Sequence, residues 1–407
     1  MKKLFKPIGY TFLLIFIFRL GVHIPVPGVD PQAIQSIVNS DAFSIFNLFN
    51  GGALSNFSIF ALGVSPYITA SIIIQLLQMD ISPTFVEWSK QGEVGRRKLT
   101  RATVLLSIFF GFIQGLGIAF GFNQFSNAQF VADPTILKYV VIAIFLTVGS
   151  TVLTLLGEYT NDRGLGNGIS TVIFASILSR VPNELYQAYE NNLMINVIVA
   201  FLIIFAIIVY IELAQLRIPM YYSKKFSGEL TQSWLPLKLN SAGVIPVIFA
   251  SSVFSVPQLM NQLLYPAGYE HSELVKFLLE CFTLASKKGV ITYAILVIMF
   301  TFFYAQVQIN PEKVADSLAK SSGYIYSVRP GEDTEKYLSS KIRHLSVLGS
   351  IYLVAITVLP IATIFHVTIN TSLLSGTSLL ILIGVAAEMS RQIRGKLTFS
   401  HYQSLID

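Results

Sequence analysis

Residues 194–213 read MINVIVAFLIIFAIIVYIEL, an almost unbroken apolar run whose single charged side chain, Glu212, lies near its end. A helix of about 20 apolar residues is long enough to cross the roughly 30 Å of hydrocarbon in a bilayer. This run therefore predicts a membrane-spanning helix.

The composition of the whole chain agrees with a membrane protein. Of its 407 residues, 53% are hydrophobic and only 12% are charged, whereas soluble domains carry about 25% charged residues. Other apolar runs recur along the chain, and several are short or interrupted by Gly, Pro or polar residues, so we expect these to border protein or a water-filled cavity. We predict an all-α fold of ten membrane-spanning helices, near residues 7–24, 63–80, 102–121, 136–158, 168–182, 194–213, 242–264, 290–309, 343–364 and 374–389.

The positions of the basic residues predict the orientation of the chain. Most Lys and Arg residues lie before the first run, in alternate loops and after the last run, and the positive-inside rule places such segments in the cytoplasm. Both termini are therefore predicted to be cytoplasmic. Because topology accounts for most of the basic charge behind the net charge of +6, DNA binding is not indicated, whereas docking to ribosomal RNA stays open. The basic residues outside these segments are Arg19, Lys138, Arg180, Lys276, Lys287 and Lys288.

Two of the predicted cytoplasmic loops, at about 214–241 and 310–342, are long and basic. Loops of this length are usually functional or disordered, so we expect a soluble partner to dock there. The alternative is that their charges only face anionic lipids.

The predicted spans divide into an N-terminal half, residues 1–182, and a C-terminal half, residues 194–389, followed by a tail at 390–407. An odd number of spans in each half would give the halves opposite orientations, as in transporters built from inverted repeats.

Residues 41–62 are apolar but are not predicted to span the membrane. Asn47, Asn50 and Asn56 interrupt the run, and an additional span here would reverse every later loop against the distribution of basic charge. We predict a short re-entrant or extracytoplasmic helix in a protein-lined cavity, and a plug fits this description.

Two spans repeat the same spacing of isoleucines. Ile68 and Ile72 are four residues apart, as are Ile169 and Ile173, so each pair lies on one helical face. Two such faces would form an apolar neck that impedes ions by dewetting. Ordinary helix packing explains the same spacing and stays open at this point.

No motif for catalysis, metal binding or a cofactor is evident. The five histidines lack the spacing of metal ligands, and the single cysteine, Cys281, is interpreted as an apolar filler. Gly164, Gly166 and Gly168 lack the preceding strand of a nucleotide-binding loop and are interpreted as a tight turn before a helix. No enzyme activity is predicted.

A small-solute secondary transporter is the alternative class of function. Such proteins normally bury acidic residues near the membrane midplane for a coupling ion. Glu158, at the end of the fourth span, is the main acidic residue of the spans, and the other acids lie in loops or at span ends. This distribution weakens the transporter hypothesis.

Sequence motifs in order along nearly the whole chain resemble the SecY family of protein-translocation channels. They are IPVPGVD at 24–30, ALGVSPYI at 61–68, QGEVGRRK at 91–98, GLGNGIS at 164–170, LKLNSAGVIP at 237–246, INPEK at 309–313, RPG at 329–331 and GTSLL at 376–380.

This resemblance implies a channel of two five-helix halves in the bacterial cell membrane. Unfolded secretory proteins would cross through it, and membrane segments would leave sideways through a lateral gate. The implied partners are the SecE and SecG subunits, the SecA motor ATPase, the ribosome and signal-sequence-bearing preproteins, with anionic lipids around the basic loops. The short N-terminus leaves open an accessory SecY that serves a dedicated export system.

The resemblance also assigns functions to particular residues. The implied pore ring is Ile68, Ile72, Ile169, Ile173, Ile248 and Ile381. The implied plug lies within about 41–57 and includes Phe46, Asn47, Phe49, Gly51 and Gly52, where the glycines would allow a hinge. The lateral gate is expected between the second and third and the seventh and eighth spans, with Gln75, Gln114 and Ser251 as polar residues that steady it or simply join helices. The implied docking residues for the motor and the ribosome are Arg217, Lys224, Lys225 and Arg329.

Overall fold

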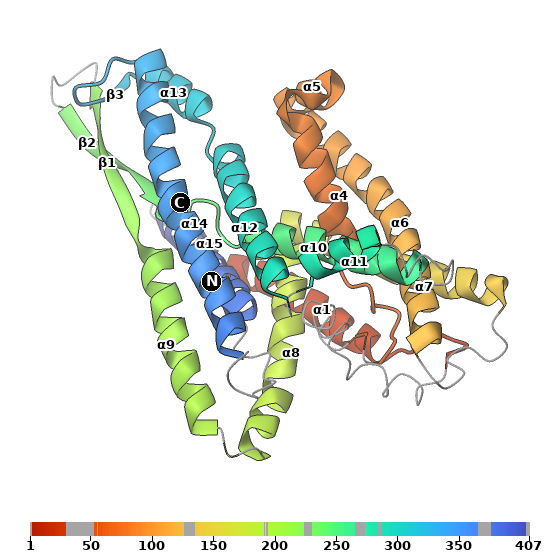
Figure 1. Ribbon diagram of the computed structural model, residues 1–407. Helices are drawn as coiled ribbons and strands as arrows, with labels where there is room; N and C mark the ends of the chain where they lie inside the picture. The colour runs from red at the N-terminus through yellow and green to blue at the C-terminus, as the bar shows by residue number, and fades with distance from the viewer. Residues whose placement is uncertain are drawn as a thin grey trace.

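The computed structural model describes most of the chain and is largely helical (Figure 1). Each predicted span coincides with a helix. The described residues are 2–29, 53–54, 56–125, 135–190, 192, 194–223, 230–264, 273–283, 286–364 and 376–403. The helices at the predicted spans are α1 (Lys2–Val22), α4 (Ser65–Leu76), α6 (Gly92–Phe125), α7 (Ile136–Arg163), α8 (Gly168–Glu190), α9 (Met194–Leu213), α10 (Ile245–Leu264), α12 (Lys287–Gln308), α14 (Glu332–Ile364) and α15 (Gly376–Gln403).

The apolar character of these helices varies. Among the described residues, 6 helices are long and apolar enough to cross a membrane by length and composition: α1, α6, α7, α9, α12 and α14. In α8 and α10 the apolar part is shorter, at Gly168–Pro182 and Ile245–Phe254. The helix α4 has 12 residues and continues into a π-helical turn, η1 (Leu77–Ile81). Short or polar spans of this kind require protein neighbours.

Several helices extend beyond their predicted spans, and in α6 and α14 charged residues continue the helix outside the apolar region. The first turn of α6 has an ion pair between Glu93 and Arg97 at 3.5 Å, and that of α14 has one between Glu332 and Lys336 at 3.5 Å. Both pairs have the i, i+4 spacing that supports exposed helix turns.

A three-stranded antiparallel sheet joins the two long loops, which the sequence analysis did not predict. Its strands are β1 (Gln215–Ser223), β2 (Leu230–Lys238) and β3 (Gly323–Ile325), in the order β2-β1-β3. The strand β3 belongs to the second loop and pairs with β1 of the first, with Met220 opposite Ile325.

The sheet packs against the second loop and the start of α14. Ile218 and Met220 alternate along β1 and share a buried cluster with Leu318 of α13 (Pro311–Lys320) and Leu338 of α14. The sheet and α13 lie at one end of the molecule, and the junction of α8 and α9 lies at the other (Figure 1).

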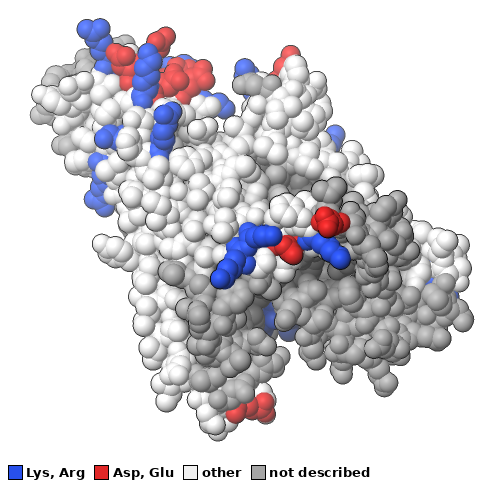
Figure 2. Space-filling view, viewed as in Figure 1, with Lys and Arg blue, Asp and Glu red and all other residues white. Residues whose placement is uncertain are grey.

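The charged side chains follow the same division. Many of them gather over the sheet, α13 and the start of α14, a second group lies in the middle of the view, and a broad uncharged surface separates the two groups (Figure 2). The helix α9 contributes to the uncharged surface, since Ile195, Leu202 and Tyr210 are exposed along its length. In water such a surface would be unfavourable, so its solvent is lipid or an apolar partner.

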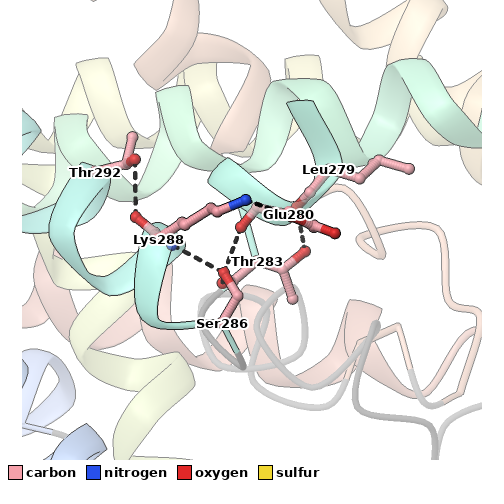
Figure 3. A network of polar contacts seen from close by, with 7 residues as sticks. Leu279, Glu280, Thr283, Ser286, Lys288 and Thr292 are labelled. Carbon is pink, nitrogen blue, oxygen red and sulfur yellow. Dashed lines mark hydrogen bonds and ion pairs between the residues drawn. The ribbon is translucent and has the colours of Figure 1, made fainter. Parts of the chain in front are cut away.

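A short helix, α11 (Glu273–Cys281), is tied to the start of α12 by a polar network (Figure 3). Ser286 caps α12 by accepting a hydrogen bond from the Gly289 N–H at 2.9 Å, and its hydroxyl donates to the Glu280 carbonyl. Lys288 Nζ lies 2.9 Å from Glu280 Oε2. These contacts fix the angle at which the chain turns into α12.

Candidate functional site

The six predicted ring isoleucines all belong to one continuous buried cluster. They are Ile68 and Ile72 on α4, Ile169 and Ile173 on α8, Ile248 on α10 and Ile381 on α15. None of them is more than 6% exposed. The helix α10 packs against α4, and α15 packs against α8. One apolar region thus joins segments from the beginning, middle and end of the chain.

Glycines let the backbone of α7 come close to the start of α8. A Cβ atom at Gly157 would lie 2.6 Å from Ile169 Cδ1, and one at Gly168 would lie 2.1 Å from the Gly157 carbonyl oxygen. Real Cβ atoms do not approach so closely, so larger residues here would displace α8 and the isoleucines it carries.

The segment that follows the predicted plug is anchored at the end of α1. The Val26 N–H donates to the Phe57 carbonyl at 3.0 Å, and the Ile59 N–H donates to the Ile24 carbonyl at 3.0 Å. The Phe57 ring packs edge-on against Phe122 at 5.1 Å between centroids. Ala53 belongs to the same buried cluster as the ring isoleucines.

The described residues between Ala53 and the start of α4 at Ser65 form turns, with one isolated β-bridge from Ser58 to Pro25, and no helix. The predicted plug residues Phe46, Asn47, Phe49, Gly51 and Gly52 lie outside the described residues.

The predicted gate residues lie on three neighbouring helices. The helix α10, which carries Ser251, packs directly against both α4, which carries Gln75, and α6, which carries Gln114. Gln114 is buried, and the buried Gln75 Oε1 has no hydrogen-bond partner among the described residues.

Ser251 forms its hydrogen bonds on its own side of the expected gate. Its hydroxyl lies 3.0 Å from the Tyr293 hydroxyl on α12 and donates to the Val247 carbonyl at 2.9 Å. Because α10 and α12 are the seventh and eighth spans, this contact joins the two helices of one side. Packing of α10 on α4 and α6 therefore makes the main contact between the sides.

A half-buried polar pair joins α4 to α7. The Tyr67 hydroxyl donates to Glu158 Oε1 at 2.5 Å. The sequence analysis identified Glu158 as a charge at a span end but not its partner, since the two residues are 91 positions apart. This hydrogen bond joins the two helices and gives both polar side chains a partner.

Three hydrogen bonds from two helices, α1 and α15, hold the turn between α7 and α8, and we call this arrangement the turn clamp. The Leu165 N–H donates to the Thr11 hydroxyl of α1 at 2.9 Å, the Gly166 N–H donates to Gln392 Oε1 of α15 at 2.8 Å, and Lys396 Nζ donates to the Gly164 carbonyl at 3.1 Å. Gly166 has a φ of +73°, which favours glycine.

The predicted glycine turn before a helix is thus confirmed, since α8 begins at Gly168. The residues that hold the turn were missed. They are separated from it by as many as 232 positions, and no local spacing indicates such contacts.

The predicted docking residues lie on or near the sheet. Arg217 is an exposed residue of β1, and Arg329 is exposed between β3 and α14. The Arg329 carbonyl accepts a hydrogen bond from the Thr334 hydroxyl at 2.8 Å, which fixes the backbone before α14. Lys224 and Lys225 lie outside the described residues.

A buried polar cluster lies where the sheet meets the helices, and the sequence analysis missed it. Asn240 Nδ2 donates to Glu212 Oε1 at 2.9 Å, and the Arg391 guanidinium lies 4.0 Å from Glu212 Oε2. Burial and the Arg391 charge lower the pKa of Lys238, while Glu212 and Glu388 oppose this change. The cluster links α9, the segment before α10 and α15.

The described residues contain no group of three or more His, Cys, Asp or Glu side chains arranged for a metal ion. Their largest shared feature is a buried apolar cluster of aliphatic and aromatic side chains from several helices.

The fold and this cluster define the class of polytopic membrane channels. A solved protein-conducting channel has a similar fold, with a TM-score of 0.70 and 20% sequence identity, over 96% of this chain and 92% of that one. Canine Sec61 in a ribosome-channel complex from the endoplasmic reticulum is also similar, with a TM-score of 0.65 and 20% identity. This match covers 96% of this chain and 92% of the Sec61 chain.

Relatives of known identity are much more similar in sequence. The protein translocase subunit SecY 1 of Lactobacillus kefiranofaciens is 44% identical, over 100% of this chain and 97% of its own. SecY of Streptococcus sanguinis is 42% identical, again over 100% and 97%. The family model for SecY matches residues 58–390. This chain is a multi-pass membrane protein that belongs to the SecY family.

Proposed function

We propose that this chain is the central channel subunit of a bacterial Sec preprotein translocase. The observation that carries the proposal is the single buried cluster that gathers all the ring isoleucines. In this function the isoleucines form a closed apolar ring between an N-terminal half, residues 1–182, and a C-terminal half, residues 194–389. Such a ring resists ions because an apolar constriction dewets, yet it yields to a polypeptide.

The plug and the gate complete the closed state. In this proposal the plug is the segment that precedes the described turns, and Ala53, which follows it in sequence, belongs to the same buried cluster as the isoleucines. A solved SecY structure is similar in fold to this chain, with a TM-score of 0.69. In that protein the plug domain stabilises the closed state of the channel and maintains a membrane seal. A signal sequence would enter by separating α10 from α4 and α6, and a membrane segment would leave by the same route.

Partners supply the energy, and the channel itself carries out no bond chemistry. The sheet, with Arg217 and Arg329, is the docking surface for the SecA motor and the ribosome in this proposal. A yeast Ssh1 complex whose fold is similar to this chain was solved on the yeast ribosome. SecE and SecG would cover exposed apolar helices, and anionic lipids would contact the basic loops.

In this proposal the sheet end, both termini and α5 (Pro83–Lys90) lie in the cytoplasm of a bacterial cell, and the distribution of basic residues supports this orientation.

The deciding experiment weakens the ring without changing the chain elsewhere. The double variant Ile68→Asn, Ile248→Asn introduces two amides that attract water into the constriction. Ion leak through purified channels in liposomes should rise, and preproteins with weakened signal sequences should be exported in cells.

The matched control is Ile208→Asn on α9. Ile208 is 0% exposed and belongs to the same cluster, but it is not a ring residue. Unchanged leak and export in the double variant, or an equal effect of Ile208→Asn, would refute the proposed ring.

A further inference from the structure

A small cleft lies where α12, α13 and α14 meet. Its volume is about 100 Å³, and its lining includes Phe302 and Gln306 of α12 and Ser339, Ile342 and Arg343 of α14. None of these residues belongs to the ring, the gate or the proposed docking residues. The cleft therefore needs an explanation of its own.

The lining combines apolar side chains, Phe302 and Ile342, with polar ones, Gln306, Ser339 and Arg343. Gln306 lies one turn after Phe302, close to the end of α12, and Arg343 lies in the part of α14 that precedes its apolar stretch. Since α12 and α14 pack side by side, their polar ends meet at the level where both helices leave the apolar region. This level corresponds to the headgroup layer of a membrane.

Arg343 provides unpaired positive charge at the cleft. It is exposed and takes part in no ion pair within the described part of the chain. No carboxylate lines the cleft. A guanidinium binds phosphate oxygens in pairs, and a neighbouring amide or hydroxyl adds further donors.

An exposed apolar surface continues from the cleft along both helices. Met299 of α12 is 53% exposed, and Val347 and Ile351 of α14 are 44% and 62% exposed. Val347 and Ile351 follow Arg343 at intervals of four residues, so all three lie on one face of α14. A ligand that used the whole surface would have an anionic head and an apolar tail.

We propose that this cleft binds the phosphate group of an anionic phospholipid, with an acyl chain along Met299, Val347 and Ile351. The site is formed at the joint between α12 and the loop that carries α13 and β3. It depends on the position of the chain in a membrane and not on the proposed export activity, so the two proposals fail in different experiments.

The test counts bound phosphatidylglycerol on the purified full-length protein by native mass spectrometry. Arg343→Gln should weaken the tightest phosphatidylglycerol site about tenfold, because it removes a charge-assisted contact to phosphate. Gln306→Ala should weaken it less. Lys320→Gln is the matched control, since Lys320 is an exposed cation of the same loop but does not line the cleft.

The thermal unfolding midpoints of the variants in neutral detergent establish that each variant is folded. Equal phosphatidylglycerol affinity in the wild-type protein and Arg343→Gln would overturn the proposal. An equal loss in Lys320→Gln would also overturn it, because net charge alone would then explain binding.

A competition experiment distinguishes binding of a lipid from binding of a free anion. Inorganic phosphate and glycerophosphoglycerol, which lack acyl chains, should not displace phosphatidylglycerol at concentrations where a second anionic phospholipid does. Full displacement by inorganic phosphate would overturn the assignment to lipid.

Discussion

Gln392 Oε1 accepts a hydrogen bond from the backbone N–H of Gly166 at 2.8 Å, although the two residues are 226 positions apart. This contact joins the last helix of the chain to the turn that precedes α8. Since α8 and α15 both carry isoleucines of the proposed ring, the turn clamp joins two of the helices that would form it.

Gln392→Ala should lower the free energy of unfolding by about 1 kcal/mol, because the Gly166 N–H loses its partner. The thermal unfolding midpoint of the purified protein in detergent measures this change. Arg394→Ala is the control, since Arg394 is an exposed residue of the same helix. Equal midpoints for Gln392→Ala and the wild type would show that the clamp adds no stability.

Gly168→Ala should prevent normal packing of α7 on α8. The new Cβ atom would lie 2.1 Å from the Gly157 carbonyl oxygen, and backbone cannot move aside as a side chain does. We expect a loss of folded protein in the membrane, measured by protease resistance. Gly395→Ala should be neutral or slightly stabilising, because nothing lies within 4 Å of its Cβ position. Normal protease resistance in Gly168→Ala would contradict this account.

Gln75→Leu should stabilise the closed channel. The buried Gln75 Oε1 has no partner among the described residues, and an unsatisfied buried acceptor costs about 1–3 kcal/mol. We expect a higher unfolding midpoint together with weaker export of preproteins that have marginal signal sequences.

The comparison for this prediction is Gln78→Leu. Gln78 Nε2 donates to the Ile74 carbonyl at 3.1 Å, so its loss should not stabilise the protein. A lower midpoint in Gln75→Leu than in the wild type would mean that the amide has a partner in the membrane.

Arg329→Glu should abolish export driven by SecA while the protein still assembles in the membrane. Arg329 is exposed beside the sheet, so the change should not disturb packing. Uptake of a preprotein into vesicles with SecA and ATP measures the effect. Lys320→Glu makes the same change of charge on α13 and should retain most of the uptake. Full uptake with Arg329→Glu would exclude this arginine from docking.

The spans were predictable because each is set by a local apolar run. The predicted span at 194–213 has the same bounds as α9, where the run begins and ends abruptly. The bounds of α6 and α14 were not predictable in the same way, since exposed ion pairs extend these helices into water. Hydrophobicity locates the part of a helix in the membrane and not its ends.

The contacts between distant segments were beyond prediction from spacing. The sheet needs β3 to meet β1 about 100 residues earlier in the chain, and β3 has only 3 residues. The partners of Glu158 and Ser251 were likewise hidden, because Tyr67 and Tyr293 lie on other helices. The isoleucines of the proposed ring were assigned through family resemblance, since their spacing alone fits ordinary packing equally well, and the ring stays a prediction.

The pairing of β1 with β3 has a mechanical consequence. The strand β1 continues directly from α9, β2 leads to α10, and β3 stands between α13 and α14. A force applied near Arg329 would therefore be transmitted through the sheet to α9, α10, α13 and α14. Because the sheet joins the two loops, a partner that binds one loop would move the helices attached to both loops together.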